Sequence, residues 1–385
     1  MNFLTCLAFL ALMAPSIHAA PTNKSGASIS TSWAGVNSYF LHAYQKNDRL
    51  VVLDAIKDAE LKTLRLFISH TQANNKNTNS VEMPDIEPKN VGTWDDTQLL
   101  AIDQLMVEAH ERGIKLIIAL HDRYMLGCWG KGKSRNPRRL LLTHLTITDA
   151  YVTKYKLPAV DCNTAQASQN DVIFFYQDAS PVSDFDNRIT HILSHRNALL
   201  PNSPQWKDLS SHIFAFNIQN EGQGHLRNNI APVPQWWCDR SKHMRSLMGA
   251  SAVLISTGGG NEFPNSDIPE NWACPTLDLV DIHSYNGVEG FKKNAPVALQ
   301  HAKDAGKLVL FEEFGATGEN KADVVGQHIE VFNGLKVPWM VWQINKPGKG
   351  AADYEFWTDE ETFDVVRDGS SEALALKAAQ PFPNL

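Results

Sequence analysis

The chain has 385 residues, of which 43% are hydrophobic and 20% are charged, and its net charge is −7. This composition supplies enough apolar material for a sizeable core, and an α/β barrel of this length forms one domain. The acidic balance argues against a nucleic-acid partner, which requires a basic face. No apolar run after the first residues is long enough to cross a membrane.

The N-terminal segment, residues 1–19, has the pattern of a secretory signal. Residues 3–13 are almost entirely apolar, and Ile-His-Ala at 17–19 is a suitable cleavage tripeptide. The alternative is an N-terminal core helix, against which the two nearby prolines argue. We therefore expect a signal peptide over 1–19 and a secreted, extracellular domain over 20–385.

Eight runs rich in Ile, Val, Leu and Phe recur along the chain. They are continuous rather than alternating, which is typical of parallel strands buried on both faces. Helical periodicity precedes the second, third, fourth, seventh and eighth runs. This alternation predicts an α/β fold consisting of a single (β/α)8 TIM barrel. The predicted strands cover residues 32–37, 63–68, 115–120, 213–219, 252–256, 279–283, 307–312 and 339–343.

Two long insertions, residues 74–88 and 124–171, follow the second and third predicted strands. Loops that follow barrel strands lie at the catalytic face, so both insertions are expected there.

Four cysteines remain after the predicted signal is removed, an even number that suggests two disulfides in a secreted chain. Three pairings are possible. Proximity along the chain favours Cys128–Cys162 and Cys238–Cys274, and four free thiols are the alternative.

Two strands end in a carboxylate: Glu221 follows the fourth strand and Glu313 follows the seventh. Glycoside hydrolysis needs one carboxyl group to protonate the leaving oxygen and a second to attack the anomeric carbon or activate water. These two strands face each other across a barrel mouth, which allows the separation of about 5–5.5 Å that retaining enzymes use. A salt-bridged acid at the barrel rim is the alternative for either residue alone.

Other polar and aromatic residues also lie in or at the ends of apolar strands. Arg65 lies inside the second strand, and a buried arginine needs an anionic partner, catalytic or structural. His121 ends the third strand, while His283 and Tyr285 end the sixth. Trp342 ends the eighth and offers a ring on which a sugar can stack, unless it only fills the core.

Three motifs carry a resemblance to a known family: Asn220-Glu221, Glu312-Glu313-Phe314-Gly315, and Trp-Ala-Gly-Val-Asn-Ser-Tyr at 33–39. They resemble the signatures of glycoside hydrolase family five in clan A, and in particular of fungal endo-β-1,4-mannanases. The resemblance implies that Glu221 is the acid/base and Glu313 the nucleophile. Glu312 is the second choice for nucleophile, and it should point to the opposite side of the strand.

The same resemblance assigns supporting roles. Asn220 would bind the sugar 2-hydroxyl, and Arg65 would hold down the pKa of the nucleophile. His283 and Tyr285 would orient the two glutamates. Trp342 would form the floor under the cleaved sugar. His121 matches a histidine that cellulases of the family often carry. Six more aromatic residues are candidates for outer subsites or for the core: Trp33, Tyr39, Trp129, Trp236, Trp237 and Trp272.

The sequence thus predicts a secreted retaining hydrolase of a β-linked polysaccharide, most similar to an endo-β-1,4-mannanase. A β-glucanase on the same barrel and a non-catalytic sugar-binding barrel are the alternatives. A cofactor enzyme lacks a phosphate-binding glycine motif in the expected place, because Ser-Thr-Gly-Gly-Gly at 256–260 follows the fifth strand. We expect a monomer with no cofactor, metal ion, nucleic acid or membrane partner.

Overall fold

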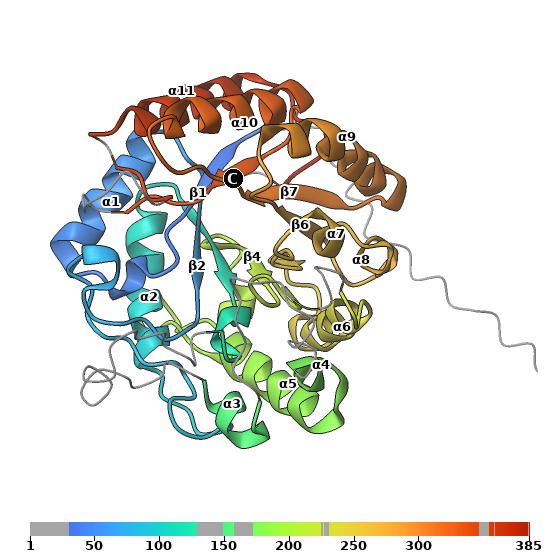
Figure 1. Cartoon of the computed structure of the whole chain (residues 1–385). Coiled ribbons are helices and arrows are strands. Elements are labelled where there is room, and N and C mark those ends of the chain that lie inside the picture. Colours follow the sequence, from blue (N-terminus) through green and yellow to red (C-terminus); the bar gives the residue numbers. More distant parts are fainter. Residues whose placement is uncertain are drawn as a thin grey trace, which may run out of the picture.

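The computed structural model is a closed barrel of eight parallel strands in the order β1 to β8, with helices around it (Figure 1). It describes residues 31–128, 149–157, 172–224, 226, 231–345, 354–357, 359–383 and 385. The (β/α)8 prediction is confirmed, and the ends of the predicted strands differ from those observed by at most two residues. The strands are β1 Ala34–Asn37, β2 Thr63–Phe67, β3 Lys115–Ala119, β4 Ile213–Asn217, β5 Leu254–Ser256, β6 Leu279–His283, β7 Leu308–Glu313 and β8 Trp339–Val341.

Helices connect the strands and cover the outside of the barrel. The predicted helical segments appear as α1, α2, α5, α9 and α10, and α2 is followed by Gly113 at φ +73°, a conformation that glycine adopts without a steric penalty. The helices are α1 Lys46–Asp58, α2 Thr97–His110, α3 Ala150–Tyr155, α4 Ile173–Gln177, α5 Ala179–Ser194, α6 Trp236–Met248, α7 Phe263–Ser266, α8 Pro269–Ala273, α9 Val288–Ala305, α10 Lys321–Leu335 and α11 Glu361–Ala375.

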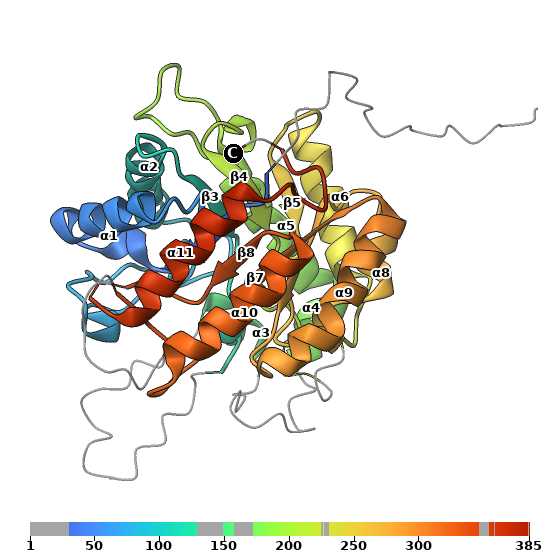
Figure 2. The same cartoon turned by 90° about the horizontal axis from the view of Figure 1, so that it is seen from above.

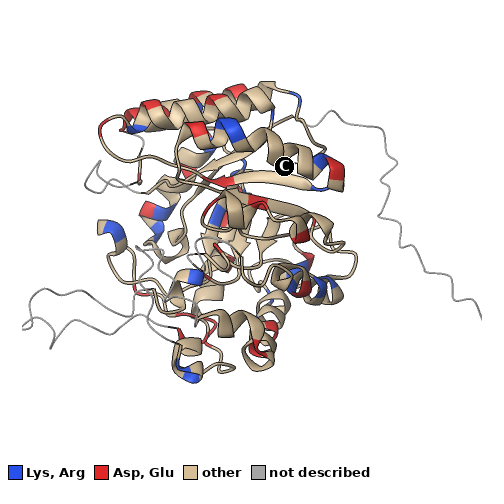
Figure 3. Ribbon diagram, turned by 45° about the vertical axis from the view of Figure 1, so that its right-hand side comes forward, with Lys and Arg blue, Asp and Glu red and all other residues tan. Residues whose placement is uncertain are grey.

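The helices α10 and α11 pack side by side on the outside of the barrel (Figure 2). Figure 3 shows acidic and basic residues spread over several helices, so charge of one sign is not concentrated on a single helix. Within the described part of the chain, no helix combines the length and the apolar character that crossing a membrane requires.

The amino end of the barrel is closed by apolar side chains. Trp33 packs edge-on against Phe214 of β4 and Phe382 of the C-terminal tail, with ring centroids 5.3 and 5.7 Å away. The tail is held by backbone hydrogen bonds from Ser32 to Leu376 and from Ala379 to Lys336. The amino end of the barrel is thus apolar, and the polar side chains of the interior lie toward the carboxyl ends of the strands.

The first insertion is described in full and the second in part. The first contains the 3-10 turn η2, Asn75–Asn77, and its far end is anchored by the fully buried Arg188 of α5, which bonds Asp85 at 2.8 Å and Glu87 at 3.2 Å. The second begins with the turn η3, Arg123–Met125, and includes α3. The rest of the second insertion lies outside the described residues, as does the predicted signal.

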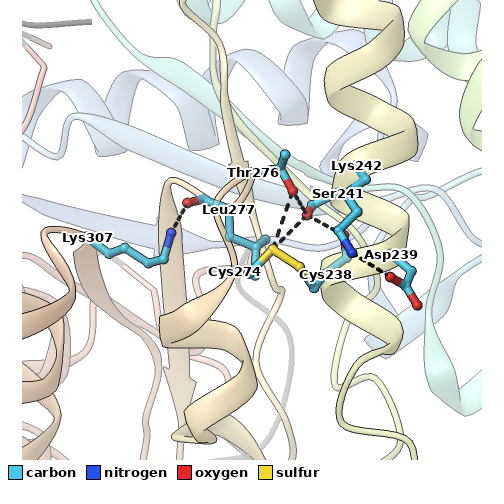
Figure 4. Close-up of a disulfide and its surroundings, with 8 residues drawn as sticks. All are labelled: Cys238, Asp239, Ser241, Lys242, Cys274, Thr276, Leu277 and Lys307. Atoms are coloured by element: carbon cyan, nitrogen blue, oxygen red, sulfur yellow. Dashed lines mark hydrogen bonds and ion pairs between the residues drawn. A yellow bond between two sulfur atoms is a disulfide. The ribbon is translucent and has the colours of Figure 1, made fainter. Parts of the chain in front are cut away.

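A disulfide joins Cys238 of α6 to Cys274, which directly follows α8, as predicted. Figure 4 shows Ser241 and Thr276 beside it, and the two hydroxyl oxygens lie 2.6 Å apart. Cys128 is also disulfide-bonded. Its predicted partner, Cys162, lies outside the described residues.

Candidate active site

The structure brings Glu221 and Glu313 together at the carboxyl end of the barrel. Glu313 is the last residue of β7, and Glu221 follows β4 by four residues. One carboxylate oxygen of each lies within 4.8 Å of the other, and both side chains are almost completely buried. Glu221 has a left-handed backbone conformation, φ +45°, which is strained for a residue with a side chain and is common at functional sites.

Glu313 receives hydrogen bonds on both carboxylate oxygens. Arg65 donates to Oε1, and the Tyr285 hydroxyl donates to Oε2 at 2.9 Å. Burial raises the pKa of Glu313 above its ordinary value, because the opposing charges of His283 and Arg65 only partly offset desolvation and the charge of Glu221 adds to it. The predicted contact with Arg65 is present, and Arg65 lowers the pKa of Glu313 as predicted, but burial outweighs it and the net shift is upward.

Arg65 lies at the centre of the polar interior, with its side chain fully buried. Its guanidinium donates to the amide oxygens of three asparagines: Asn217 at 2.7 Å, Asn220 at 2.8 Å and Asn37 at 3.1 Å. It also lies 3.1 Å from a carboxylate oxygen of Glu312. Arg65 is therefore fixed from several strands at once beneath Glu221 and Glu313.

Glu312 does not point away from Glu313, contrary to the prediction. The pairing of β6 with β7 shifts register at this point, so that Ile282 pairs with Phe311 while His283 pairs with Glu313. Such a bulge inserts an extra residue and re-aims its side chain. Glu312 and Glu313 thus both reach Arg65. Although burial opposes it, the charge of Arg65 and the hydrogen bond from His283 lower the pKa of Glu312.

His283 connects the three glutamates. Its Nδ1 lies 3.4 Å from Glu221 and 3.6 Å from Glu313, and its Nε2 lies 3.0 Å from Glu312. Burial alone would lower its pKa, but the charge of Glu313 and the bonds to Glu221 and Glu312 raise it to about 10. The ring is therefore a cation at neutral pH and donates from both nitrogens.

Tyr124 was not predicted from the sequence, yet its hydroxyl contacts Glu221 at 2.5 Å. Its place is set by Asp122, whose carboxylate accepts from the Tyr124 backbone N–H at 3.2 Å and from the Asn220 side-chain amide at 3.0 Å. Burial, reinforced by the charge of Glu221, raises the pKa of Tyr124 well above its ordinary value, so the hydroxyl keeps its proton. In the sequence, the only feature that points to Tyr124 is its position at the start of the second insertion.

Aromatic rings form a platform at the end of β8. The half-buried Trp342 lies nearly parallel to Tyr39, with ring centroids 5.7 Å apart and an angle of 6° between the planes, and it is tilted against Phe67. The Asn75 side-chain amide donates to the Tyr39 hydroxyl at 2.6 Å. Trp342 is thus more accessible than Trp339, which is fully buried in the core.

The other aromatic candidates lie elsewhere or in the core. Trp33 plugs the opposite end of the barrel, so of its two alternatives the structure supports the core and not an outer subsite. Trp236, Trp237 and Trp272 are buried. Trp129 lies outside the described residues.

His121 does not contact Glu221 or Glu313 in the described structure. Its Nε2 lies 2.7 Å from Asp149, and its Nδ1 accepts from the Gln219 side-chain amide at 2.9 Å, so both ring nitrogens are occupied in the described structure. Its backbone oxygen accepts from the N–H of Asn220 at 2.8 Å. His121 therefore supports the backbone that carries Asn220 and Glu221.

Glu221, His283 and Glu313 are also close enough together to surround a metal ion. However, Arg65 and Tyr285 already donate to both oxygens of Glu313, and a cationic His283 offers protons rather than a lone pair. The donor set suits hydrogen bonding and proton transfer better than it suits a divalent cation.

No protein-family model matches the chain. The probable mannan endo-1,4-β-mannosidase A of Aspergillus flavus is 24% identical over 310 residues, which cover 75% of this chain and 69% of that protein. The probable mannosidase F of the same fungus is 24% identical over 336 residues, which cover 81% of this chain but only 63% of the relative.

Among solved structures, the endo-1,4-β-mannanase of Rhizomucor miehei superposes with a TM-score of 0.65 at 16% identity, covering 89% of this chain and 95% of that one. The endo-β-1,4-mannanase of Thermotoga petrophila gives 0.64 at 16% identity, covering 89% and 77%. At these identities the superpositions establish the fold. In sequence the chain resembles fungal proteins named as probable mannan endo-1,4-β-mannosidases, and in fold it resembles endo-1,4-β-mannanases and a glycoside hydrolase family 5 mannosidase of Rhizomucor miehei.

Proposed function

We propose that the chain is a retaining glycoside hydrolase that cleaves β-1,4-linked mannan, with Glu221 as the acid/base and Glu313 as the nucleophile. The observation that carries the proposal is the approach of two buried carboxylates, within 4.8 Å, at one end of a barrel. Retaining enzymes hold the two groups about 5–5.5 Å apart, whereas inverting enzymes need about 6.5–9.5 Å to admit a water molecule between sugar and base.

In the first step, an oxygen of Glu313 attacks the anomeric carbon while Glu221 gives its proton to the leaving glycosidic oxygen. The C–O bond to the leaving sugar breaks, and an ester bond to Glu313 forms. In the second step, Glu221 takes a proton from water, whose oxygen displaces Glu313 and restores the enzyme. Arg65, Tyr285 and His283 hold the Glu313 carboxylate in one orientation for both steps.

Two further groups serve the substrate in this proposal. The half-buried Trp342, backed by Tyr39 and Phe67, offers an aromatic face for the apolar CH side of a sugar ring. Asn220, fixed by Arg65 and Asp122, would bond the 2-hydroxyl next to the reacting carbon. The choice of mannan rests on the names of the curated relatives, which act on mannan endo-1,4-β bonds.

Secretion is part of the proposal and rests on residues 1–19. Expression in a eukaryotic secretory host should release the protein into the medium with an N-terminus near residue 20. Retention of the intact N-terminus inside the cell would contradict the signal assignment. Size-exclusion chromatography of the secreted protein tests the predicted monomer.

The function is tested by product release from mannan, glucomannan, carboxymethyl cellulose, xylan and β-1,3/1,6-glucan, with Glu313→Gln as the inactive control. Mannan oligosaccharides released only by the wild type, with the anomeric configuration retained in the first products, would support the proposal. Cleavage of a glucan alone would replace mannan by a β-glucan. Binding without cleavage would favour a sugar-binding barrel.

A further inference from the structure

Glu312 is an ionisable residue to which the proposed reaction gives no task. It has no exposed surface, so it is not placed to contact a polysaccharide. Its carboxylate nonetheless accepts hydrogen bonds from His283 Nε2 and Asn217 Nδ2, each at 3.0 Å, and forms an ion pair with Arg65, whose Nε lies 3.1 Å away. A buried carboxylate is costly unless it is paired in this way. Here the pairing uses two cations of the site: His283, which faces Glu221 and Glu313, and Arg65, which contacts Glu313.

The geometry gives Glu312 control over the direction of the His283 ring. The ring presents Nε2 to Glu312 and Nδ1 to Glu221 and Glu313, so an acceptor at Nε2 fixes which nitrogen faces the reacting pair. The bulge in β7 makes this possible, because an unbulged strand would turn Glu312 away from Arg65 and His283.

A neighbouring acid, Asp281, does not share this task. Its Oδ2 accepts from the Gly258 N–H at 2.6 Å and lies 3.2 Å from Asn217 Nδ2. Burial and the charge of Glu312 raise the pKa of Asp281 to about 8, so it is neutral where Glu312 is ionised. The charged or titratable groups that face His283 are Glu221 after β4, Glu262 after β5, Asp281 on β6, Glu312 and Glu313 on β7, and Arg65 on β2.

We propose that Glu312 is a positioning residue that holds His283 between Glu221 and Glu313 and Arg65 against Glu313, and that its negative charge sets the pH range of turnover without taking part in bond making. This inference rests on the proposed hydrolase function. It also gives the two adjacent glutamates different roles, because only Glu313 is expected to become covalently linked to the sugar.

The test compares pH profiles of kcat/KM on an activated aryl β-mannoside. In Glu312→Gln the shape of the side chain is kept but the charge is lost. Ionisation of Glu313 then becomes easier, and the acidic limb moves to lower pH by about two units, the size expected for one charge about 6 Å away at an effective dielectric near 20. Activity falls but remains measurable. Glu312→Asp keeps the charge, so its acidic limb should stay at the wild-type pH although kcat falls.

Two control variants accompany these. Asp281→Asn should leave the acidic limb in place, because Asp281 is already neutral at those pH values. Glu289→Gln removes an exposed carboxylate on α9 that pairs only with Lys292 in the described structure, and its kcat, its kcat/KM and its pH profile should match those of the wild type.

A loss of kcat in Glu312→Gln with an unmoved pH profile would reduce Glu312 to a structural role. Complete inactivity, equal to that of Glu313→Gln, would make Glu312 the nucleophile candidate. Either result overturns the proposal.

A second measurement does not depend on hydrolysis. NMR of protein labelled with ¹⁵N-histidine, with His283 assigned by the loss of its signals in His283→Gln, reports the protonation of this ring. The pKa of His283 should fall in Glu312→Gln and stay near the wild-type value in Glu312→Asp. If no polymer or aryl glycoside is cleaved, the proposed function fails, and this titration still decides whether Glu312 holds His283. An unchanged titration in Glu312→Gln would overturn that.

Discussion

At the amino end of the barrel, Trp33, Phe214 and Phe382 pack edge to face with almost no exposed surface. At the carboxyl end, Arg65 and His283 lie among buried glutamates with equally little exposed surface. Both ends are therefore close-packed, but only the first gains stability directly from burial of apolar area. The second must offset the desolvation of several charges with hydrogen bonds, so it is maintained for what the charges do.

The difference between the two ends can be tested most strongly at Glu313. Glu313→Gln should lower kcat by about 10⁴-fold or more, because a nucleophile that acts together with its partners is lost. Its thermal unfolding temperature should stay close to that of the wild type, since an amide of the same shape fills the site. Steady-state kinetics and circular dichroism measure the two quantities. A variant with near-normal kcat would reject the nucleophile assignment.

At the opposite end, Trp33→Ala should lower the free energy of unfolding by about 3–5 kcal/mol, because it leaves a cavity between Phe214 and Phe382. Activity measured well below the unfolding transition should be unaffected. Chemical denaturation checks the first expectation.

Trp342→Ala is the matched variant at the carboxyl end. It should lower kcat/KM by about 10²-fold on polymer while changing stability less, because the ring is half-buried and is the sugar platform that we propose. If both variants lost activity and stability equally, the two ends would not be functionally distinct.

The pH dependence of stability should also differ between the two ends of the barrel, because the titratable groups His283 and Asp281 lie at the carboxyl end. The folded-state pKa of His283, about 10, lies above its ordinary value of 6.5, so its contribution is fully present below about pH 6.5 and is lost as pH rises through 10. Asp281 has the same sign: its folded-state pKa of about 8 lies above the ordinary value of 3.8, so its contribution is fully present below about pH 3.8 and is lost as pH rises through 8. The two losses overlap around and just above neutral pH, where urea unfolding should show stability declining by a few kcal/mol, at about 1.4 kcal/mol for each unit of pKa shift.

The free energy of unfolding should decline less steeply with rising pH in His283→Gln than in the wild type. In Trp33→Ala it should be lower at every pH but decline with the wild-type slope. A slope that is the same in His283→Gln and in the wild type would show that the cation at the carboxyl end does not control the alkaline loss of stability.

The smallest expected effect concerns Tyr124. Tyr124→Phe removes the hydroxyl that contacts Glu221 and should reduce kcat/KM by about tenfold, the usual size of one hydrogen bond to a charged group. The loss should be smaller for aryl glycosides with good leaving groups, which need little protonation. Equal losses on activated and natural substrates would argue that Tyr124 only shapes the loop.

Local patterns predicted the barrel because each strand is an unbroken apolar run and each long helix shows its own periodicity. They also identified Glu221, Glu313, Arg65, His283, Tyr285 and Trp342, because a polar or aromatic residue at a strand end is conspicuous in an apolar context. The contacts of His121 with Asp149 and Gln219 could not be predicted, because Asp149 lies just before α3 and Gln219 just after β4, both far from His121 in sequence. The same applies to Tyr124, whose position depends on how the loop after β3 folds.

The sequence by itself determined the eight-stranded architecture and the two carboxylates, since alternation of apolar strands and helices permits few other folds. Only the tertiary structure decided the direction of Glu312, because the strand period of two predicts the wrong side unless the bulge between β6 and β7 is known. It also decided which charges share one buried space, and hence that the pKa of Glu313 rises while that of Glu312 falls. Hydrophobic periodicity is a local property of the chain, whereas electrostatic coupling depends on distances between atoms that are far apart in sequence.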